Sequence, residues 1–598
     1  MIKKSIKIGN AGGFWGDDLK ALRRQLEGGN LDYITADYLA EITMSILRKQ
    51  NQRNPKLGYV TDFVDQIDDV AELLYTKKVK MITNAGGINP KACAVEITNI
   101  LNKKNIPLKV AVIEGDNIID KLDDFYCCEV DFKNIETGEN FFDIKDNIES
   151  ANVYLGFPPI LKALESGADI IIAGRVTDTS ITMAPAIFEF GWKINDWDKL
   201  ASALVAGHII ECGAQSSGGN FTDWHLINKW DNFGYPIVEI FEDGDFIVTK
   251  HPNTGGLITE NSIKEQIVYE MGDPSKYISP DVIADFRTIK LEEIAENKVK
   301  ISGVKGYPAT NSFKVSMAYK DGFWANGSII ISSPNAKEKA EIFKEMFWKR
   351  LNIKFEKQNT EYVGYNATHL GLSKEITPNE ILLRFGVYDN DASKIEEFGK
   401  ELAPLILSGP SGVAVTGGRP RPRNVMSYWP ALIPKHFIKS EVAVFDKNGN
   451  IEQEFSIDSI TGYEDEQIQI SEISFIPADT NKYDVLVKVN LHKICLARSG
   501  DKGDMANIGV IARTDGIYKY LKTHLTTTLI KSWFSDFCKG EVSRFELDNI
   551  LGLNFLLAKS LDGGGTKSLM IDAQGKTFAS ALLNQEMEIP QSLLNSIK

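Results

Sequence analysis

The sequence predicts an α/β protein with a mostly parallel sheet flanked by helices, followed by a small α+β ferredoxin-like domain. Short apolar runs alternate with helical segments through the first part of the chain, which is typical of βαβ units. Several of these runs end in glycine-rich polar loops, as expected at the carboxyl ends of parallel strands. From residue 481 onward, the strand pattern begins again after an acidic stretch.

The length of the chain predicts more than one domain. It has 598 residues, whereas single cores rarely exceed roughly 250–300 residues. We expect an α/β catalytic or binding region over residues 1–445, a linker over 446–480 and the small domain over 481–598. A break near 290–300 would divide the first region into two subdomains.

The composition excludes several classes of protein. The formal charge is −14, which argues against nucleic-acid and membrane-surface partners because these need concentrated Lys and Arg. No apolar run approaches the ~18 residues of a membrane span, and the first residues lack the apolar core of a signal peptide. We therefore expect a cytoplasmic protein. Its six cysteines form no CxxC pair, so neither a disulfide framework nor a zinc site is predicted.

The first predicted strand begins at Ser5 and ends in the loop Asn10-Ala-Gly-Gly, and Asp17 follows shortly after. The glycine spacing is not G-x-G-x-x-G, so it does not predict a nicotinamide cofactor. No other cofactor and no metal is predicted, although CoA would enter as part of the substrate discussed below. The candidate binding residues of this loop are Asn10, Gly12 and Gly13.

The same four residues recur at Asn84-Ala-Gly-Gly, after the predicted strand Lys80–Thr83. Asn89 is a typical helix N-cap and Pro90 a typical first-turn residue. Amide groups left bare at a helix start attract anions, so we expect Asn84, Gly86 and Gly87 to bind substrate. The alternative is a tight turn with only a structural role.

Between and after these loops the apolar spacing predicts further elements in order. The expected strands are 31–34, 108–113 and 168–173, and the expected helices are 37–48, 63–75 and 160–165.

The loop after the strand 168–173 is the best single site candidate. Arg175 offers a planar fork for a carboxylate or phosphate, and Asp178 is a candidate base. The hydroxyls of Thr177, Thr179 and Ser180 stand at the start of the next helix. The alternative is that Asp178 caps that helix and pairs with Arg175.

A second polar run extends from Gly207 to His225. Glu211 is a candidate acid–base group, and Cys212 with His208 or His225 is a candidate nucleophile and base. A small core cysteine is the alternative. A divalent metal held by Glu211, Asp223, His208 and His225 is a further alternative, although their spacing matches no known ligand pattern. Gly219, Asn220 and Asp223 are expected to bind substrate.

Later segments add further polar loops. Thr254 and Gly255 precede a predicted helix and form another candidate anion loop. The alternation over 298–332 predicts antiparallel strands, and a helix is expected over 336–351. The arginines of 419–423 are either part of an anion site or partners of surface carboxylates.

The last domain is expected to contain a strand over 485–491, a dense polar loop over 495–509 and a helix over 517–537. A second glycine-rich loop spans 562–566. The two loops predict a composite binding site made of Arg498, Asp501, Lys502, Asp504, Gly564 and Thr566.

Several long motifs resemble the acyclic terpene utilisation family, AtuA, and they occur in order along nearly the whole chain. They are Ile8-Gly-Asn-Ala-Gly-Gly-Phe-Trp-Gly-Asp, Asp37-Tyr-Leu-Ala-Glu-Ile-Thr-Met-Ser, Ala173-Gly-Arg-Val-Thr-Asp-Thr-Ser, Gly207-His-Ile-Ile-Glu-Cys-Gly and Gly219-Asn-Phe-Thr-Asp-Trp. Leu496-Ala-Arg-Ser-Gly-Asp-Lys-Gly-Asp and Leu561-Asp-Gly-Gly-Gly-Thr resemble the ferredoxin-fold domain appended to many members. The resemblance implies breakdown of citronellol- and geraniol-type compounds through acyl-CoA intermediates, but it transfers no catalytic residue.

We therefore expect a homo-oligomeric catabolic enzyme that acts on a branched acyl-CoA, or its carboxylated derivative, by hydration or C–C lysis. Asp178 is the candidate base, and Asp17 or Glu211 is the second acid–base group. The alternatives are a non-catalytic scaffold for an acyl-CoA carboxylase or dehydrogenase and a metal-dependent hydrolase.

Overall fold

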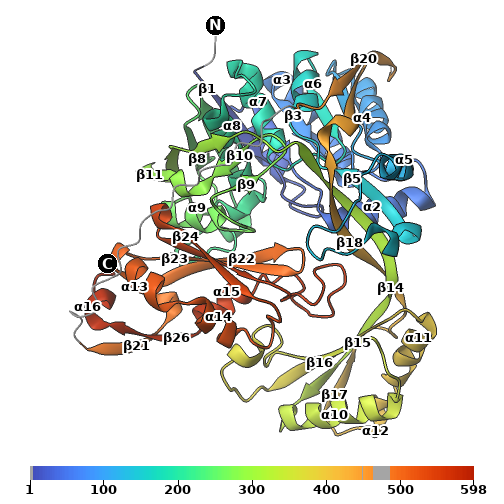
Figure 1. The fold of residues 1–598 in the computed structure, drawn as a ribbon, viewed down its shortest axis with the longest axis vertical. Helices are drawn as coiled ribbons and strands as arrows, with labels where there is room; N and C mark the ends of the chain where they lie inside the picture. The colour runs from blue at the N-terminus through green and yellow to red at the C-terminus, as the bar shows by residue number, and fades with distance from the viewer. Residues whose placement is uncertain (1–3, 447–448, 462–484, 598) are drawn as a thin grey trace. The chain divides into compact units, whose positions relative to one another are not determined.

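The computed structural model describes residues 4–446, 449–461 and 485–597. These residues form two compact units. The first unit contains residues 4–318, 429–446, 449–461 and 546–552, and the second contains 319–428, 485–545 and 553–597. The chain leaves the first unit within strand β14 (Ser312–Ser332) and returns to it within β18 (Arg423–Pro434) (Figure 1). Residues 447–448 and 462–480 of the predicted linker lie outside the described residues.

In the described part of the chain, the main sheet of the first unit has eleven strands in the order β11-β12-β8-β7-β1-β2-β3-β6-β4-β19-β20. Its centre is parallel, with Ile34 opposite Met81 and Ile82 opposite Ile171. The parallel strands are β1 (Ser5–Asn10), β2 (Tyr33–Ala36), β3 (Lys80–Thr83), β6 (Ile170–Ala173) and β4 (Val110–Glu114). Their carboxyl ends therefore meet at one edge.

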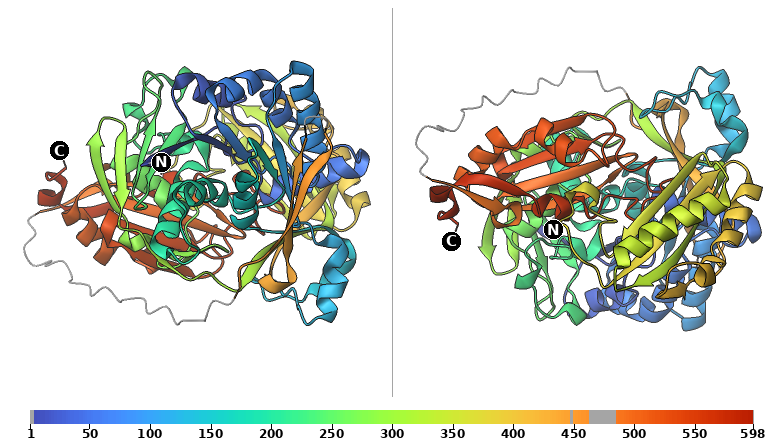
Figure 2. Two further views of the ribbon diagram at one scale, coloured as in Figure 1. Left: turned by 90° about the horizontal axis from the view of Figure 1, so that it is seen from above. Right: turned by 90° about the horizontal axis from the view of Figure 1, so that it is seen from below.

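Both flanks of this sheet are antiparallel, so the prediction of a mostly parallel sheet is wrong. One flank is formed by β7 (Pro236–Phe241), β8 (Phe246–Lys250), β12 (Lys298–Ser302) and β11 (Lys290–Ala295). The other contains β19 (Lys439–Phe445) and β20 (Ile451–Asp458). The cause is local, because β7 and β8 are joined by a tight hairpin turn, which pairs sequence neighbours antiparallel. Figure 2 shows the orange β19 and β20 beside the blue strands of the same sheet.

Two groups of helices cover the parallel strands. Helices α1 (Ala21–Gly28), α3 (Thr61–Lys77) and α4 (Pro90–Lys104) share a buried core with β2, β3, β4 and β6. Helices α6 (Pro158–Glu165), α7 (Ser180–Phe190) and α8 (Trp197–Ile210) pack on one another and on the strands. The predicted helices 63–75 and 160–165 are thus confirmed. None of the described helices is long and apolar enough to cross a membrane.

The helix predicted over 37–48 begins later than expected. Helix α2 spans Glu41–Arg53, and Asp37 lies in the loop after β2. The cause is the Asp37 side chain, which accepts a hydrogen bond from the Leu39 amide and thereby favours a turn over a helix. The remaining short elements of this unit are α5 (Leu122–Cys127), β5 (Ile148–Val153), α9 (Glu260–Ile267), β9 (Tyr277–Ile278), β10 (Ile283–Asp285) and β13 (Lys305–Tyr307).

The second unit begins with a sheet in the order β15-β16-β14-β17. It contains β15 (Lys357–Val363), β16 (Glu380–Asp389) and β17 (Val413–Thr416), with helices α10 (Ala336–Leu351), α11 (Ala392–Glu401) and α12 (Leu405–Ser408). The helix expected over 336–351 is confirmed. The core between this sheet and its helices is aromatic, and the ring centres of Phe347 and Phe385 lie only 4.3 Å apart.

The C-terminal part of this unit has a four-stranded sheet in the order β22-β23-β25-β24. The strands are β22 (Cys495–Lys502), β23 (Met505–Ala512), β25 (Gly552–Leu557) and β24 (Val542–Leu547), with α15 (Phe578–Leu583) packed on β22 and β23. Strands β21 (Leu486–Asn490) and β26 (Glu586–Pro590) form a separate pair, and α16 (Gln591–Leu594) follows β26.

Two predictions for this part are wrong. The polar loop expected over 495–509 is the hairpin β22-β23, because Ser499 finds buried partners in the Gly575 carbonyl and the Ala579 amide and can therefore occupy a strand. The helix expected over 517–537 is divided into α13 (Asp515–His524) and α14 (Thr527–Trp533). Thr526 causes the break, since its side chain caps α14.

Candidate functional site

Polar residues lie at the carboxyl ends of all five parallel strands of the first unit, either as the last residue of the strand or within two residues after it. β1 ends at Asn10, β2 is followed by Asp37, β3 by Asn84, β4 by Asp116 and β6 by Arg175. All five residues are buried. Buried polar groups at one sheet edge are the usual setting for a ligand site in an α/β fold. The structure thus brings together Asn10, Asn84 and Arg175, as the sequence predicts.

Arg175 organises the centre of this edge. Its Nη1 donates to Asp178 Oδ1 at 2.5 Å and to the Leu39 carbonyl at 3.1 Å, and its guanidinium carbon lies 4.1 Å from the centre of the Tyr154 ring. The Arg175 side chain is only 4% exposed, whereas that of Asp178 is 34% exposed. Arg175 is therefore held inside the protein and presents Asp178 at the surface of the site.

Asp37 is the second carboxyl of the site. Its Oδ1 accepts from Asn84 Nδ2 at 2.6 Å, and Asn84 Oδ1 accepts from the Tyr38 amide at 2.8 Å. Burial raises the pKa of Asp37 well above the usual range, and the charge of Asp178 raises it further, while Arg175 acts in the opposite direction. Asp37 and Asp178 thus lie in unlike electrostatic environments within one site.

Asp116 fixes the loop that contains Arg175. Its Oδ2 accepts from the Arg175 amide at 2.9 Å and from Asn152 Nδ2 at 2.7 Å. Burial raises the pKa of Asp116 to about 6 despite these hydrogen bonds. A Cβ at Gly174 would lie 2.4 Å from Asp116 Oδ1, so this approach requires glycine. The role of Asp116 is therefore to position the Arg175 loop.

Tyr154 packs against the Arg175 guanidinium, and Glu41 binds Tyr154. The Tyr154 hydroxyl donates to Glu41 Oε1 at 2.7 Å, and Lys314 Nζ lies 5.2 Å from the centre of the Tyr154 ring. Burial alone would raise the pKa of Glu41, but the charges of Lys314 and Arg175 outweigh it and the pKa is lowered. Arg175 is thus enclosed by an aromatic face and by anionic groups, which fixes its orientation.

The loop after β1 contacts the end of α8. The Gly13 amide donates to Asp17 Oδ2 at 2.9 Å, and Asp17 Oδ1 accepts from the Tyr235 hydroxyl at 2.5 Å. A Cβ at Gly13 would lie 2.6 Å from the carbonyl carbon of Cys212. Predicted site residues from two distant motifs, Gly13 with Asp17 and Cys212, are therefore neighbours.

Glu211, which follows α8 directly, connects the residues at the end of α8 with the carboxyls of Asp37 and Asp178. Its Oε1 lies 3.4 Å from His208 Nδ1, and its side chain is 14% exposed. The charge of Glu211 contributes to the raised pKa of Asp37, and the pKa of Tyr277 is raised well above its usual value by burial first and by the charges of Glu211 and Asp178 next. Three carboxyls, Asp37, Asp178 and Glu211, thus share one region.

The loop Asn84–Gly87 differs from its predicted role as a source of bare amides. The Ala85 amide donates to Thr83 Oγ1, and those of Gly86, Gly87 and Asn89 donate to backbone carbonyls. Asn89 caps α4 through the Ala92 amide, as predicted. A Cβ at Gly86 would lie 2.6 Å from the Ala173 carbonyl oxygen. This loop packs tightly, and its contribution to the site is the Asn84 side chain.

The hydroxyls after Arg175 differ in their partners. Ser180 Oγ donates to the Thr177 carbonyl at 2.6 Å. Thr179 is buried, and a Cβ at Gly207 would approach its Cα to 2.9 Å. Thr177 Oγ1 is buried and makes no hydrogen bond to any residue that the structure describes. An unpaired buried hydroxyl beside Asp178 is a candidate ligand contact.

The remaining candidates of the first unit lie in loops that pack on one another. The Leu257 amide donates to the Ser217 carbonyl, and Thr254 Oγ1 donates to the His251 carbonyl at 2.6 Å. Gly255 donates to Asn232, and Gly219 to Ala214. Asp223 is buried, whereas Asn220 is exposed. Thr254 and Gly255 lie shortly after β8, whereas Gly219 packs against Ala214 and Gln215.

Within the described residues, no group of three or more His, Cys, Asp or Glu side chains is arranged to hold a metal ion. His225 is exposed and His208 is buried between the rings of Tyr277 and Phe286.

The predicted composite site of the C-terminal domain lies in the second unit. Asp504 Oδ1 accepts from the Gly563 amide at 2.8 Å, and a Cβ at Gly564 would lie 2.8 Å from the Gly503 carbonyl oxygen. Lys576 pairs with Asp501 at 3.2 Å, and Arg498 is buried. The turn of the hairpin β22-β23, which directly follows Lys502, and the loop that contains Thr566 are thus adjacent. Arg419 of the basic run pairs with Glu396 at 3.3 Å, which fits the surface-carboxylate alternative.

Sequence reasoning missed four side chains of the site: Asp37, Glu41, Asp116 and Tyr154. Asp37 and Asp116 had a detectable signal, since each follows a predicted parallel strand as Asn84 and Arg175 do. Glu41 and Tyr154 had none, because their contact with Arg175 depends on tertiary packing.

Two family models match the chain. The model described as "Acyclic terpene utilisation family protein AtuA" matches residues 6–444, and the model described as "AtuA ferredoxin-like domain" matches residues 489–588. The second match confirms the ferredoxin-like character predicted for the C-terminal domain. No curated protein and no solved structure matches the chain.

Proposed function

Since the chain belongs to the acyclic terpene utilisation AtuA family, we propose that it is a cytoplasmic catabolic enzyme that acts on an acyl-CoA or carboxylated acyl-CoA intermediate. Membership of the family suggests involvement in acyclic terpene utilisation. The proposed reaction is hydration or C–C lysis, and the proposed centre is the carboxyl cluster at the edge of the parallel strands.

The observation that supports this proposal most strongly is the contrast between Asp37 and Asp178. Asp37 is buried with a raised pKa, while Asp178 is partly exposed and bound to Arg175. Two carboxyls in unlike environments are the usual basis for dividing acid and base roles in one site. Asp178 is therefore the proposed base and Asp37 the proposed acid, with Glu211 as a further group.

In a hydration, Asp178 accepts a proton from the attacking water while the oxygen of that water bonds to the β-carbon. A proton from Asp37 is then delivered to the α-carbon, so that charge and atoms balance. Arg175 orients Asp178 through their hydrogen bond, because Arg175 is itself fixed by the Leu39 carbonyl and the Tyr154 ring. Thr177 Oγ1 is the proposed contact to a polar group of the substrate.

The proposal is tested with purified protein and a panel of branched acyl-CoA esters, their enoyl forms and their carboxylated derivatives. We expect saturable binding and turnover of at least one member, followed by mass spectrometry of the products. Absence of both binding and turnover would contradict the proposal. Saturable binding of an ester without any turnover would instead favour the scaffold alternative.

A further inference from the structure

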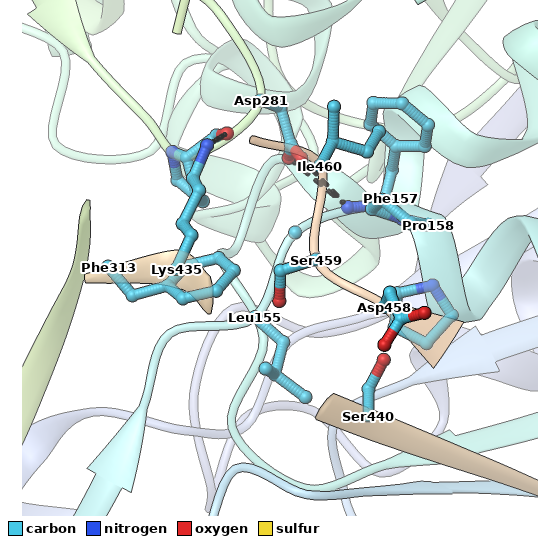
Figure 3. Close-up of a pocket in the computed structure, with 13 residues that line it drawn as sticks. Leu155, Phe157, Pro158, Asp281, Phe313, Lys435, Ser440, Asp458, Ser459 and Ile460 are labelled. Atoms are coloured by element: carbon cyan, nitrogen blue, oxygen red, sulfur yellow. Dashed lines mark hydrogen bonds between the residues drawn. The ribbon is translucent and has the colours of Figure 1, made fainter. Parts of the chain in front are cut away.

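A pocket of the first unit, apart from the carboxyl cluster, contains a buried lysine that the proposed reaction does not use (Figure 3). Its walls come from the start of α6, from Pro280 and Asp281, and from the segment after β18 that contains Lys435. The ends of β19 and β20 close it, with Ser440 and Asp458–Ile460. Most of these walls are apolar, including Leu155, Phe157, Phe313 and Ile460.

Lys435 is only 2% exposed, which is rare for a lysine. Its Nζ donates to the Pro280 carbonyl at 2.6 Å and lies 5.5 Å from the centre of the Phe313 ring. Asp281, in the same pocket, accepts from the Phe157 amide at 3.1 Å and 3.2 Å, one of which Figure 3 marks. The amine is thus held at the wall of an apolar pocket.

This pocket is separate from the carboxyl cluster but shares a wall with it. Phe313 and Lys314 are consecutive residues of β14, so their side chains point to opposite faces. Lys314 faces the Tyr154 ring, and Phe313 faces Lys435. The shared wall also contains Leu155, whose amide donates to the Arg175 carbonyl and whose carbonyl accepts from the Thr177 amide.

The charges of the pocket select the kind of ligand. Asp281 and Asp458 both line it, which disfavours a carboxylate or phosphate. Apolar walls favour a neutral molecule with a short hydrocarbon chain. A primary amine among such walls is suited to a carbonyl compound, because the cationic form of the product is stabilised by the nearby carboxyl of Asp281.

We propose that the Lys435 pocket binds a small aliphatic aldehyde, which forms an imine with Lys435 Nζ. The lone pair of the neutral amine attacks the carbonyl carbon and gives a carbinolamine. The carbinolamine then loses the former carbonyl oxygen as water, together with the two protons that the amine contributed, and a C=N bond remains. No oxidant, reductant or further reactant is needed.

The titration of Lys435 supports this reactivity. Burial lowers the pKa of Lys435 to about 8, although the charge of Asp281 acts in the opposite direction. An ordinary lysine has a pKa of about 10.4, so near neutral pH the neutral, nucleophilic fraction of Lys435 is far larger. Asp458 pairs with Lys439 at 3.0 Å, and Lys439 is a well-exposed lysine from the adjacent strand. Lys439 is therefore the exposed reference lysine for the labelling experiment.

The test is reductive trapping of the folded full-length protein with butanal and sodium cyanoborohydride, followed by peptide mapping by mass spectrometry. At pH 7.0 we expect Lys435 to be butylated at least about tenfold faster than Lys439, because of its larger neutral fraction. At pH 9.5 the advantage should shrink. Labelling of Lys435 no faster than Lys439 at pH 7.0 would overturn the proposal.

Two variants sharpen the test. Lys435→Met should abolish the fast label, whereas Lys439→Met should leave its rate unchanged. Should Lys435→Met fail to fold, peptide mapping of the labelled wild-type protein still shows whether Lys435 is butylated faster than Lys439. Because the readout is a labelled residue and not turnover of an acyl-CoA ester, failure here is distinguishable from failure of the proposed function.

Discussion

At the scale of single residues, the environment of each carboxyl decides its chemistry. Asp37, Asp116 and Asp281 are buried and have raised pKa values, whereas the partly buried Glu41 has a lowered one. Glu41 differs because two cations, Lys314 and Arg175, act on it. The sequence shows each carboxyl but not its neighbours, so these differences could not be predicted from it.

The raised pKa of Asp116 has a measurable effect on stability. The unfolded residue releases its proton near pH 3.9, whereas the folded residue retains it until pH about 6. The folded protein therefore binds more protons between these values, and this residue makes stability fall as the pH rises through that window. Two pKa units correspond to about 3 kcal/mol.

We expect Asp116→Asn to remove this loss. The difference in unfolding free energy, variant minus wild type, should rise by up to about 3 kcal/mol between pH 4 and pH 7 in urea titrations. Asp18→Asn is the control, and for it the difference in unfolding free energy should fall as the pH rises. The reason is that the pKa of Asp18 is lowered by Arg24 and the Lys20 amide despite partial burial. A difference for Asp116→Asn that does not change with pH would contradict the assignment.

At the scale of elements, the site depends on loops that meet at one sheet edge. The strands that end in these loops could be predicted, since their apolar runs are short and end in glycine or asparagine. The hairpin β22-β23 could not, because Ser499 finds its partner in the distant Gly575. The late start of α2 could not either, because Asp37 accepts hydrogen bonds both from the Leu39 amide and from the distant Asn84. The sequence neighbours of Ser499 and Asp37 alone would predict a loop and a helix, respectively.

The contact between the β1 loop and the end of α8 gives a test at this scale. Gly13→Ala should destabilise the protein by about 1–3 kcal/mol, because the added Cβ would lie 2.6 Å from the Cys212 carbonyl carbon. Gly12→Ala in the same loop is the matched control, since its nearest neighbour would be a Tyr38 ring atom at 3.8 Å.

Both variants are compared by guanidinium unfolding monitored by circular dichroism. Gly12→Ala is expected to change the stability by less than about 1 kcal/mol. Equal stability of the two variants would show that the close approach of Gly13 to Cys212 does not hold in solution.

At the scale of the whole molecule, the sequence indicated the family, the α/β class and the ferredoxin-like domain, and all three are confirmed. The extent of the parallel sheet was overestimated, because the flanking strands pair through hairpins and through the distant β19 and β20. The candidate centre could be located at Arg175 and Asp178, but Asp37 was missed because its carboxyl was assigned to a helix.

The central claim is that Asp178 acts as the base in a site organised by Arg175. The most direct measurement is the turnover number of Asp178→Asn for the best acyl-CoA ester of the panel, together with its dissociation constant. Asp169→Asn is the matched control, since Asp169 lies just before β6, pairs with Lys80 at 3.3 Å, and stands at the opposite edge of the sheet. We predict that Asp178→Asn lowers the turnover number by about 10²–10⁴-fold with little change in binding, while Asp169→Asn retains the wild-type rate. A wild-type turnover number in Asp178→Asn would contradict the claim.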